Sequence, residues 1–571
     1  MVEKEVYGAA GSRIPSPDAS NQPTLSSALD GKLAGFQLTD KFQAFRPIQT
    51  EALERILVSK AKYIILQAPT GTGKTLIGVA LQKITGRGMA YVVKTIQLEE
   101  QIARDFPHGV LLKGRSNYPT HNKPNDFPRI NAELCMMKGA QHCSWCCSGK
   151  EMASLDQLDE EYSSSCDGRS RCPYFQQKLR AMRASLAIVN ISLFLTEAQY
   201  TGAFSQRDWV VLDEADTIED SLMNFVGVTI TEKWVERFHL PAPRFKTKQD
   251  SWVDWAKEEA LPKLREQLKA LLSVSTWKLS DLQDEREVSS AIDKLMYFVH
   301  SASNSMWVYK QTANTRGELS HVFKPVFVAH HAQSHLWCHG KRFLLMSATI
   351  VSPDQMVRDL GIPPSEMEFI NLPSTFSPRR RLVHYVPGPA MSNKTRAEAW
   401  PEMVQSMDNV LKGQRQVKTL VHTVSAELAR YVKEHSKFRA QMITYGDGIR
   451  REEALRRFIH AHPPSILVAQ GMERGVDLLD DLCRCIIILK IPFPNLGDQQ
   501  VQKRVYSVRD GQEWYMVRTW RSLIQATGRG MRHEADYCQT FILDAQFGKI
   551  LWRSKRLAPR WWLEAVRWSE K

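Results

Sequence analysis

One eight-residue stretch, APTGTGKT at positions 68–75, constrains the fold of this chain more than any other feature. It follows the apolar run YIILQ and precedes LIGVALQKI, so it lies between a predicted strand and a predicted helix. In that setting, successive backbone N–H groups and the N-terminus of the helix cradle an anion. The pattern therefore predicts a parallel α/β sheet with a phosphate-binding loop at the end of one strand.

The residues of this loop divide into groups that bind and groups that shape the turn. We expect Lys74 to reach the β- and γ-phosphates of a nucleotide and the Thr75 hydroxyl to ligate Mg²⁺. Ala68 stands where such loops usually begin with glycine, and it is small enough to keep the loop tight. The other members of the predicted site are Pro69, Thr70, Gly71, Thr72 and Gly73. A Gly-rich turn formed by chance is the alternative, but spacing, residue types and flanks all favour the phosphate site.

A second apolar run, WVVLDEAD at positions 209–216, ends in carboxylates. Asp213 is placed to hold Mg²⁺ through water, and Glu214 is the natural base for an attacking water molecule. Acidic residues after a strand also cap helices, and alone that interpretation would be the better one. The phosphate loop upstream favours the metal site.

The stretch SLIQATGRGMRHEAD, at positions 522–536, carries Gln525, Arg529 and Arg532. The two arginines are three residues apart and so share one face of a short helix. Guanidinium groups that face a nucleotide stabilise the charge that develops on the γ-phosphate. The alternative is a solvated basic surface.

The hydrophobic pattern divides the chain into several units. Strand–helix alternation over much of its length indicates an α/β fold with parallel sheets. We expect a flexible tail over 1–28, a first lobe over 29–216 with a Cys-rich insertion at 108–178, a helical insertion over 217–335, the end of the first lobe and a linker over 336–377, and a second lobe over 378–571. The N-terminus has no apolar signal segment, and no run is long enough for a membrane span, so we expect a cytoplasmic protein without a membrane partner.

The charge balance favours a polyanionic partner. The 571 residues include 76 Lys and Arg against 62 Asp and Glu, a net charge of +14. The final stretch, 552–568, is both basic and aromatic. Candidate contacts to a nucleic-acid strand are Lys94, Arg115, Tyr118, Lys178, Arg180 and Arg379 to Arg381. For each one singly, a solvated surface is the simpler interpretation.

Taken together, these motifs resemble superfamily-two helicases, and among them the XPD/DinG group of iron–sulfur DNA helicases. The resemblance runs from about Phe45 to Phe547. It includes FRPIQ at 45–49 with Arg46 and Gln49, KTIQLEEQ at 94–101, SAT at 347–349, AQGMERGVDLL at 469–479 with Glu473, Gly475 and Asp477, and QATGRGMR at 525–532. The cysteine-rich stretch before DEAD and the helical stretch after it favour this group over DEAD-box RNA helicases.

The resemblance implies two RecA-like P-loop NTPase lobes that bind ATP and Mg²⁺ between them. Lys74 and Glu214 of one lobe and Arg529 of the other should converge on one triphosphate. It also implies 5′→3′ travel on single-stranded DNA and unwinding of forked duplex, and other nucleic-acid-processing proteins are candidate partners. Three positions depart from the group's pattern: Asp216 replaces a usual His, Ile191 follows Asn190 where His is usual, and Thr120 replaces the usual first cluster cysteine.

Six clustered cysteines predict a metal site. They are Cys135, Cys143, Cys146, Cys147, Cys166 and Cys172. Four thiolates suit a [4Fe–4S] cluster or tetrahedral zinc, and spacing leaves both open. The resemblance favours the iron–sulfur cluster, with Cys172 as its last ligand and Cys135 or Cys143 in place of the missing first one. Loss of the cluster is the alternative. We expect Cys338, Cys483, Cys485 and Cys538 to be core residues.

Other functions remain open on the sequence alone. An RNA helicase or a duplex translocase would share every nucleotide motif. An ATP-gated nucleic-acid clamp with a zinc-stabilised module would bind DNA without turnover stimulated by single strands. Glu214, Arg529 and Arg532 argue against the clamp, because they are residues that hydrolysis needs.

Overall fold

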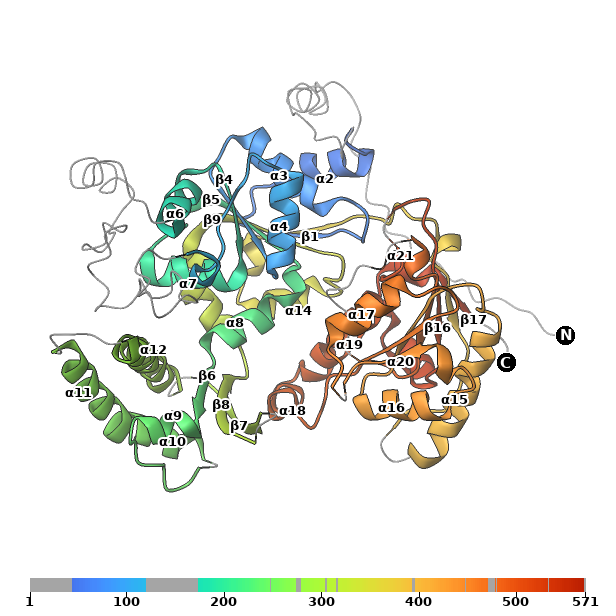
Figure 1. Ribbon diagram of the computed structural model, residues 1–571. Coiled ribbons are helices and arrows are strands. Elements are labelled where there is room, and N and C mark those ends of the chain that lie inside the picture. Colours follow the sequence, from blue (N-terminus) through green and yellow to red (C-terminus); the bar gives the residue numbers. More distant parts are fainter. Residues whose placement is uncertain are drawn as a thin grey trace, which may run out of the picture.

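The computed structural model contains two α/β lobes side by side and a smaller module next to both (Figure 1). It describes residues 44–119, 173–246, 248–273, 279–302, 305–314, 317–392, 396–446, 448–470, 478, 480–531 and 533–568. The predicted tail, the cysteines from Cys135 to Cys172 and Thr120 lie outside these ranges. The two-lobed fold class predicted from the sequence is confirmed.

Lobe one is built on a seven-stranded parallel sheet with the order β10-β1-β9-β5-β2-β4-β3. Its strands are β1 (Tyr63–Gln67), β2 (Met89–Val93), β3 (Val110–Leu111), β4 (Leu186–Asn190), β5 (Arg207–Asp213), β9 (Gly340–Ser347) and β10 (Met367–Asn371). All five residues of β1 are buried. Tyr63 and Ile65 join one core, whereas Ile64 and Leu66 join the core on the opposite face, because successive strand residues point to opposite sides.

Helices cover both faces of this sheet. They are α2 (Pro47–Val58), α3 (Lys74–Thr85), α4 (Ile96–Asp105), α6 (Pro173–Arg183), α7 (Ile191–Thr201), α8 (Ile218–Val226), α13 (Ala329–His335) and α14 (Pro353–Leu360). Short 3₁₀ turns lie at Arg115–Asn117, Ala215–Thr217, Trp337–His339, Pro364–Glu366 and Pro378–Arg380. No helix among the described residues combines the length and apolarity that a membrane crossing needs.

Lobe two repeats the architecture with a second seven-stranded parallel sheet, ordered β13-β14-β12-β15-β16-β11-β17. Its strands are β11 (Val383–Tyr385), β12 (Thr419–His422), β13 (Met442–Ile443), β14 (Ile466–Ala469), β15 (Cys485–Ile488), β16 (Gln539–Ile542) and β17 (Val566–Trp568). Its helices are α15 (Arg396–Lys412), α16 (Ala426–His435), α17 (Arg451–His460), α18 (Gln499–Tyr506), α19 (Gly511–Thr527), α20 (Gln546–Ser554) and α21 (Arg560–Leu563), with 3₁₀ turns at Arg439–Gln441, Asp480–Leu482 and Lys555–Leu557.

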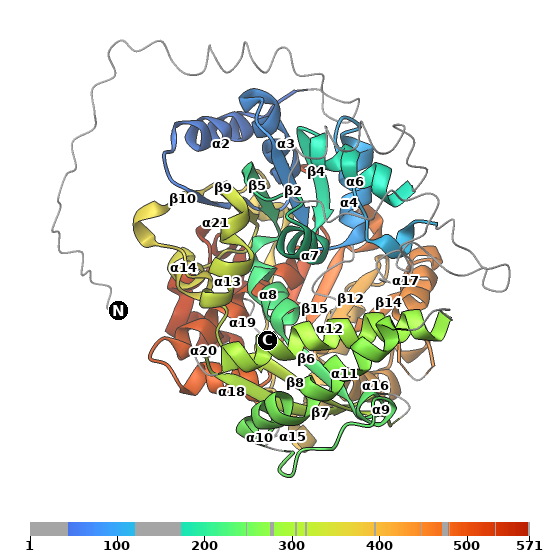
Figure 2. The same ribbon diagram turned by 90° about the vertical axis from the view of Figure 1, so that its left-hand side faces the viewer.

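The module inserted after DEAD contains a small sheet that the sequence did not predict. Three antiparallel strands, in the order β6-β8-β7, pack against its helices (Figure 2). The elements are β6 (Val228–Thr231), α9 (Glu232–Arg237), α10 (Gln249–Trp255), a π-helical turn (Ala256–Ala260), α11 (Leu261–Leu272), α12 (Leu279–Ala302), β7 (Trp307–Ala313) and β8 (Leu319–Pro325). The expected range of 217–335 is wider than this module, because Ile218, Leu222 and Ala332 pack in the lobe-one core.

Four cysteines outside the clustered six were predicted to be core residues, and three of them are. Cys483, Cys485 and Cys538 are buried. Cys338 is exposed, and its Sγ donates to the Ser334 carbonyl at 3.3 Å, so its expected place in the core is wrong. It lies at the end of α13, in the turn that leads into β9, where one side of the chain faces solvent.

Candidate functional site between the two lobes

The phosphate loop lies between β1 and α3, as its sequence predicts. Gly71 and Gly73 have φ values of 84° and 80°, which residues with a Cβ rarely adopt. A Cβ on Gly73 would also lie 2.3 Å from Gln49 Nε2, and one on Gly71 would lie 1.9 Å from the Phe376 ring. Both positions therefore require glycine. Lys74 extends back over the loop, and its Nζ donates to the Ala68 carbonyl at 3.2 Å.

Arg46 and Gln49, at the start of α2, hold this loop from one side. Arg46 Nη1 donates to the Gly71 carbonyl at 2.7 Å, and Gln49 Nε2 donates to the Thr72 carbonyl at 2.8 Å. The Arg46 backbone N–H donates to Gln49 Oε1 at 2.9 Å, so the two side chains also fix each other. Within the loop, the Thr72 hydroxyl donates to the Pro69 carbonyl at 2.8 Å. The loop is thus shaped before any ligand arrives.

Asp213 and Thr75 meet at one tyrosine that the sequence analysis did not single out. The Tyr91 hydroxyl, on β2, donates to Asp213 Oδ2 at 3.1 Å and also interacts with the Thr75 side chain. Burial raises the pKa of the Asp213 carboxyl, and the neighbouring Lys74 ammonium opposes that shift. A carboxylate and a hydroxyl at the N-terminus of α3 are oxygen ligands of the kind Mg²⁺ takes. The residues present therefore fit a magnesium ion.

Glu214 directly follows β5 in a strained conformation. Its φ of 54° and ψ of 41° lie in the left-handed region, which costs a residue with a Cβ about 1–2 kcal/mol. Its backbone N–H donates to Asp213 Oδ1 at 2.9 Å, which orients the Asp213 carboxylate. Strain of this kind concentrates at functional sites.

Asp216 of the DEAD stretch is hydrogen-bonded to residues of the SAT and QATGRGMR stretches. Its Oδ1 accepts a hydrogen bond from the Ser347 hydroxyl at 2.7 Å, and its Oδ2 accepts one from Gln525 Nε2 at 2.8 Å. Gln525 Nε2 also lies 2.8 Å from the Thr349 hydroxyl. Because Gln525 belongs to α19 of lobe two and the other three belong to lobe one, these bonds join the lobes.

The last turn of α19 brings lobe two against the phosphate loop itself. A Cβ on Gly528 would lie 3.9 Å from the Thr70 hydroxyl. Arg529 follows, and its positive charge reaches His422 at the carboxyl end of β12. Burial, with Arg529 as the second cause, lowers the pKa of His422 to about 3. Arg46 of lobe one also lies 3.9 Å from Glu534 of lobe two. Among the described residues, Arg46, Thr70 and Gln525 of the predicted nucleotide site thus border one interface between the lobes.

Comparisons with known proteins agree with this geometry. A model of the DEAD/DEAH box helicase family matches residues 46–118, and a model of the helicase C-terminal domain matches residues 412–565. A solved XPD helicase superposes with a TM-score of 0.60 at 15% identity, over 93% of this chain and 100% of that one. Xpd4 of S. tokodaii superposes with a TM-score of 0.54 at 14% identity, over 92% and 100% of the two chains. This chain therefore has the fold of the solved XPD helicases.

Sequence relatives match this chain over a short stretch or at low identity. The Fanconi anemia group J protein homolog of Gallus gallus is 36% identical over 92 residues, which are 14% of this chain and 7% of that protein. A "probable ATP-dependent helicase" of Methanocaldococcus jannaschii is 21% identical over 604 residues, which cover 87% of this chain and 91% of that one. The chain therefore spans only a small part of the first of these relatives.

Several predicted site residues lie outside the described ranges. They are Arg532, Glu473, Gly475, Asp477 and the cysteines Cys135, Cys143, Cys146, Cys147, Cys166 and Cys172. Their roles remain predictions.

The prediction that Lys178 contacts a nucleic-acid strand is wrong. Its side chain is 3% exposed and its Nζ lies 2.5 Å from Glu197 Oε2, so it forms a buried ion pair between α6 and α7. Glu197 also accepts a hydrogen bond from the Tyr174 hydroxyl at 2.5 Å, and the Arg115 guanidinium lies 4.2 Å from the Tyr174 ring centroid. Burial can hold a lysine where a carboxylate pairs with it, and sequence alone does not show that partner. Arg381 is likewise occupied, 5.4 Å from the Trp561 ring.

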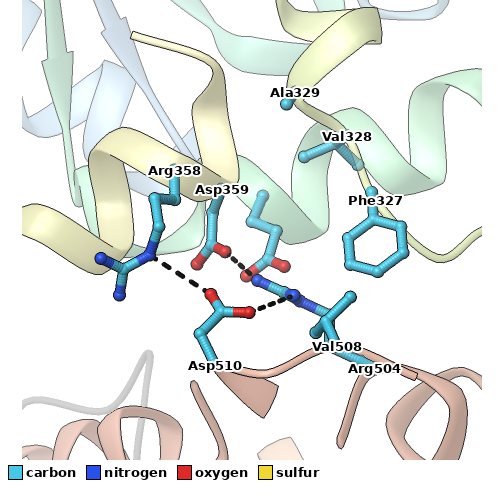
Figure 3. Close-up of a pocket in the computed structure, with 9 residues that line it drawn as sticks. Phe327, Val328, Ala329, Arg358, Asp359, Arg504, Val508 and Asp510 are labelled. Carbon is cyan, nitrogen blue, oxygen red and sulfur yellow. Dashed lines mark hydrogen bonds and ion pairs between the residues drawn. The ribbon is translucent and has the colours of Figure 1, made fainter. Parts of the chain in front are cut away.

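A second contact region between the lobes is densely charged. It surrounds a cavity of about 240 Å³ lined by Glu219, Phe327, Val328, Ala329, Arg358, Asp359, Arg504, Val508 and Asp510 (Figure 3). Arg504 of α18 pairs with Asp359 of α14, and each side chain is 4% exposed. Arg358 Nε lies 3.3 Å from Asp510 Oδ2, and Arg518 Nη2 lies 2.7 Å from Asp220 Oδ1. This region was absent from the sequence-based predictions.

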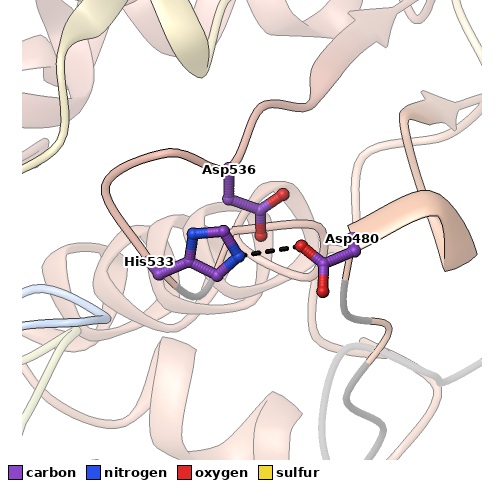
Figure 4. A group of neighbouring side chains, drawn as sticks. All are labelled: Asp480, His533 and Asp536. Carbon is purple, nitrogen blue, oxygen red and sulfur yellow. Dashed lines mark hydrogen bonds and ion pairs between the residues drawn. The ribbon is translucent and has the colours of Figure 1, made fainter.

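Asp480, His533 and Asp536 lie close together and connect the residues that follow the stretch at 469–479 with those that follow the stretch at 525–532 (Figure 4). His533 Nε2 lies 2.8 Å from Asp480 Oδ1. The Arg484 guanidinium pairs with Asp536 and lies 3.0 Å from Asp481 Oδ1. Because a guanidinium already neutralises Asp536, this cluster suits an internal ion-pair network better than a metal ion.

Proposed function

We propose that this chain is an ATP-dependent DNA helicase that translocates 5′→3′ on single-stranded DNA and unwinds forked duplex. One observation supports this most strongly. Gln525 of lobe two binds Asp216 and Thr349 of lobe one, while Gly528 lies against Thr70 of the phosphate loop. The nucleotide site is therefore shared between lobes, so that hydrolysis and lobe movement depend on each other.

In this proposal each residue has a distinct task at the triphosphate. Lys74 binds the β- and γ-phosphates, while Thr75 and Asp213 hold Mg²⁺, which neutralises charge on the phosphate oxygens. Glu214 orients and deprotonates the attacking water, and Arg529 and Arg532 stabilise the charge that develops on the γ-phosphate. Arg46 and Gln49 serve the adenine side, and Gly475 and Asp477 the ribose side. The residues at 68–73 wrap the phosphates with backbone N–H groups.

The Asp216 contacts supply a route from nucleotide to strand. Ser347 ends β9 and Thr349 follows two residues later, at the same edge of the sheet as Asn190 at the end of β4. Asn190 caps α7, since its Oδ1 accepts from the Leu193 N–H at 2.9 Å, and it also interacts with the buried Glu99 of α4. These groups share one edge of the lobe-one sheet, and we assign the binding of single-stranded DNA to this edge. A shift of Gln525 relative to Asp216 would therefore change the position of the groups that contact the DNA.

The insertion at 108–178 completes the proposal. We infer that four of its six cysteines bind a [4Fe–4S] cluster or zinc, with the resemblance favouring iron–sulfur. Residues 113–118 and α6 are joined by the Tyr118–Tyr174 ring contact at 5.4 Å, and the buried Lys178–Glu197 pair joins α6 to α7. A firm base would let such a domain act as a wedge against duplex.

The test measures ATP turnover with single-stranded DNA, single-stranded RNA and duplex, and unwinding of forked DNA. We expect single-stranded DNA to stimulate turnover most and Lys74→Ala to abolish turnover while DNA binding remains. ATP-dependent DNA binding without stimulated turnover would indicate the clamp instead, and preferential stimulation by RNA would indicate an RNA helicase. Iron and zinc analysis of the anaerobically purified protein identifies the metal.

A further inference from the structure

The outer face of α20 and the turn after it carries an unusual combination of side chains. Phe547, Ile550 and Ser554 are buried at helical spacing and anchor the helix to lobe two. The opposite side is exposed and consists of Lys549, Trp552, Arg553, Lys555 and Arg556. Four cations and one indole therefore share a single solvent-facing strip.

The stretch of sequence that contains this strip has few acidic residues. Residues 546–568 contain six Lys and Arg and one carboxylate, a net charge of +5, against +14 for the whole chain of 571 residues. That carboxylate, Glu564, is 3.2 Å from Arg560 Nε and is engaged there. A strip of this kind attracts polyanions.

Two exposed indoles extend the strip into a surface. Trp552 is 82% exposed and Trp568 is 67% exposed, whereas eight other tryptophans among the described residues are at most 4% exposed. Gly548, one turn before Trp552, lies against Tyr385, since a Cβ there would be 2.9 Å from the Tyr385 hydroxyl. The Tyr385 ring in turn lies 4.9 Å from the Trp568 ring. Trp552 and Trp568 therefore flank one patch of lobe two.

We propose that this basic aromatic surface, comprising Lys549, Trp552, Arg553, Lys555, Arg556 and Trp568, binds single-stranded nucleic acid. Cations follow the phosphates, and unpaired bases stack on indoles irrespective of sequence. Duplex hides the faces of its bases, so two exposed indoles favour a single strand.

The surface is separate from the site between the lobes. Trp568 is on β17, the edge strand of the lobe-two sheet, while His422, whose pKa Arg529 lowers, ends β12 in the interior of that sheet. Single-stranded nucleic acid bound on this surface would lie apart from the interface between the two lobes. The inference adds a second contact for the single-stranded DNA of the proposed function, on which it rests.

The experiment compares binding of the full-length chain to fluorescent oligo(dT) of about 10 and about 40 nucleotides by anisotropy, at several salt concentrations. Trp552→Ala with Trp568→Ala should weaken binding of the long oligonucleotide about tenfold. Lys549→Glu with Arg553→Glu should also lower the salt slope by about 1.4, since each phosphate contact contributes about 0.7. Turnover stimulated by saturating short oligonucleotide should not change.

A matched control changes two exposed cations at the other edge of the same sheet, Lys437→Glu with Arg439→Glu, next to β13. Equal weakening in this control, unchanged binding in the Trp552 and Trp568 variant, or equal loss of duplex binding in that variant would overturn the proposal. If single strands fail to stimulate turnover of the native chain, the proposed function fails, whereas a loss of long-strand binding in the Trp variant would still establish the surface.

Discussion

The two lobes meet at two interfaces of opposite character. The nucleotide interface, formed by Asp216 and Thr349 with Gln525, uses an amide, a hydroxyl and one carboxylate. The charged interface, formed around Asp359 and Arg504, buries full charges on both sides.

This difference teaches which interface is suited to open. The hydrogen bond from the Gln525 amide to the Asp216 carboxylate contributes about 1.5–3 kcal/mol, because water replaces the amide when the bond breaks. A buried ion is costly when it loses its partner, on the order of 3–5 kcal/mol. We therefore expect the nucleotide interface to open and close with each ATP while the charged interface stays in contact as a pivot.

The largest effect should come from the chemistry at the nucleotide interface. Glu214→Gln should lower stimulated ATP turnover about 10³-fold, because the amide cannot take a proton from water. ATP binding and the urea midpoint should stay close to those of the native chain. Turnover within tenfold of native would remove Glu214 from its assigned role.

Breaking the charged interface should instead affect stability. Arg504→Met leaves Asp359 buried without its guanidinium and should lower the free energy of unfolding by about 3–5 kcal/mol, measured as a shift of the urea midpoint. The control is Arg358→Met, whose side chain is 45% exposed, with a cost of at most about 1 kcal/mol. Equal shifts in the two variants would contradict the distinction between buried and exposed pairs.

A smaller effect is expected for the contact that couples the lobes at the nucleotide. Gln525→Ala removes the donor to Asp216 and Thr349. It should reduce stimulated turnover about tenfold, because a hydrogen bond to a carboxylate contributes on the order of 1.5 kcal/mol, while the KM for ATP changes less than about threefold. Gln500→Ala serves as a control, since Gln500 Nε2 donates to the Val326 carbonyl away from the nucleotide. Loss of turnover in both variants would point to general loosening of the lobes.

The smallest effect concerns pH. Burial, reinforced by the charge of Asp359, raises the pKa of Glu219 to about 7, against an ordinary value of 4.5. The folded chain thus holds a proton that the unfolded chain releases, so this stability is present below about pH 4.5 and is lost as pH rises through about 7. Arg518 and Arg504 oppose the shift, and the Trp514 indole donates to Glu219 at 3.2 Å.

We therefore expect Glu219→Gln to raise the thermal midpoint at pH 8 by a few degrees, on the order of 1–2 kcal/mol, and to change little at pH 5. Glu99→Gln is the matched control in lobe one, because burial raises the pKa of Glu99 to about 7 as well. Each variant should remove part of the pH dependence, and an unchanged slope in Glu219→Gln would show that Glu219 is ionised in the folded chain.

Local sequence patterns were enough to predict the lobes and the core of the nucleotide site. The run YIILQ is buried at all five positions, and Gly71 and Gly73 have the positive φ values that the loop requires. These features depend on neighbours within a few residues, which the sequence displays directly.

Features that depend on distant partners were not predictable in the same way. In the sequence, Tyr91 resembles any other apolar residue of a strand. Its role appears only in the fold, where its hydroxyl donates to Asp213, 122 positions away. Lys178 reads as a solvated cation until Glu197 buries it. Strand β8, LSHVFKP, alternates only weakly in the sequence because its exposed side includes Ser320 and Lys324 while its buried side includes His321.

The most direct test of the central claim is a structure of the chain bound to a non-hydrolysable ATP analogue and Mg²⁺. We predict that the Lys74 ammonium of lobe one and the Arg529 guanidinium of lobe two both lie about 3 Å from γ-phosphate oxygens, with the metal held by Thr75 and Asp213. An analogue bound by lobe one alone, with Arg529 facing a separate cavity, would contradict the shared nucleotide site.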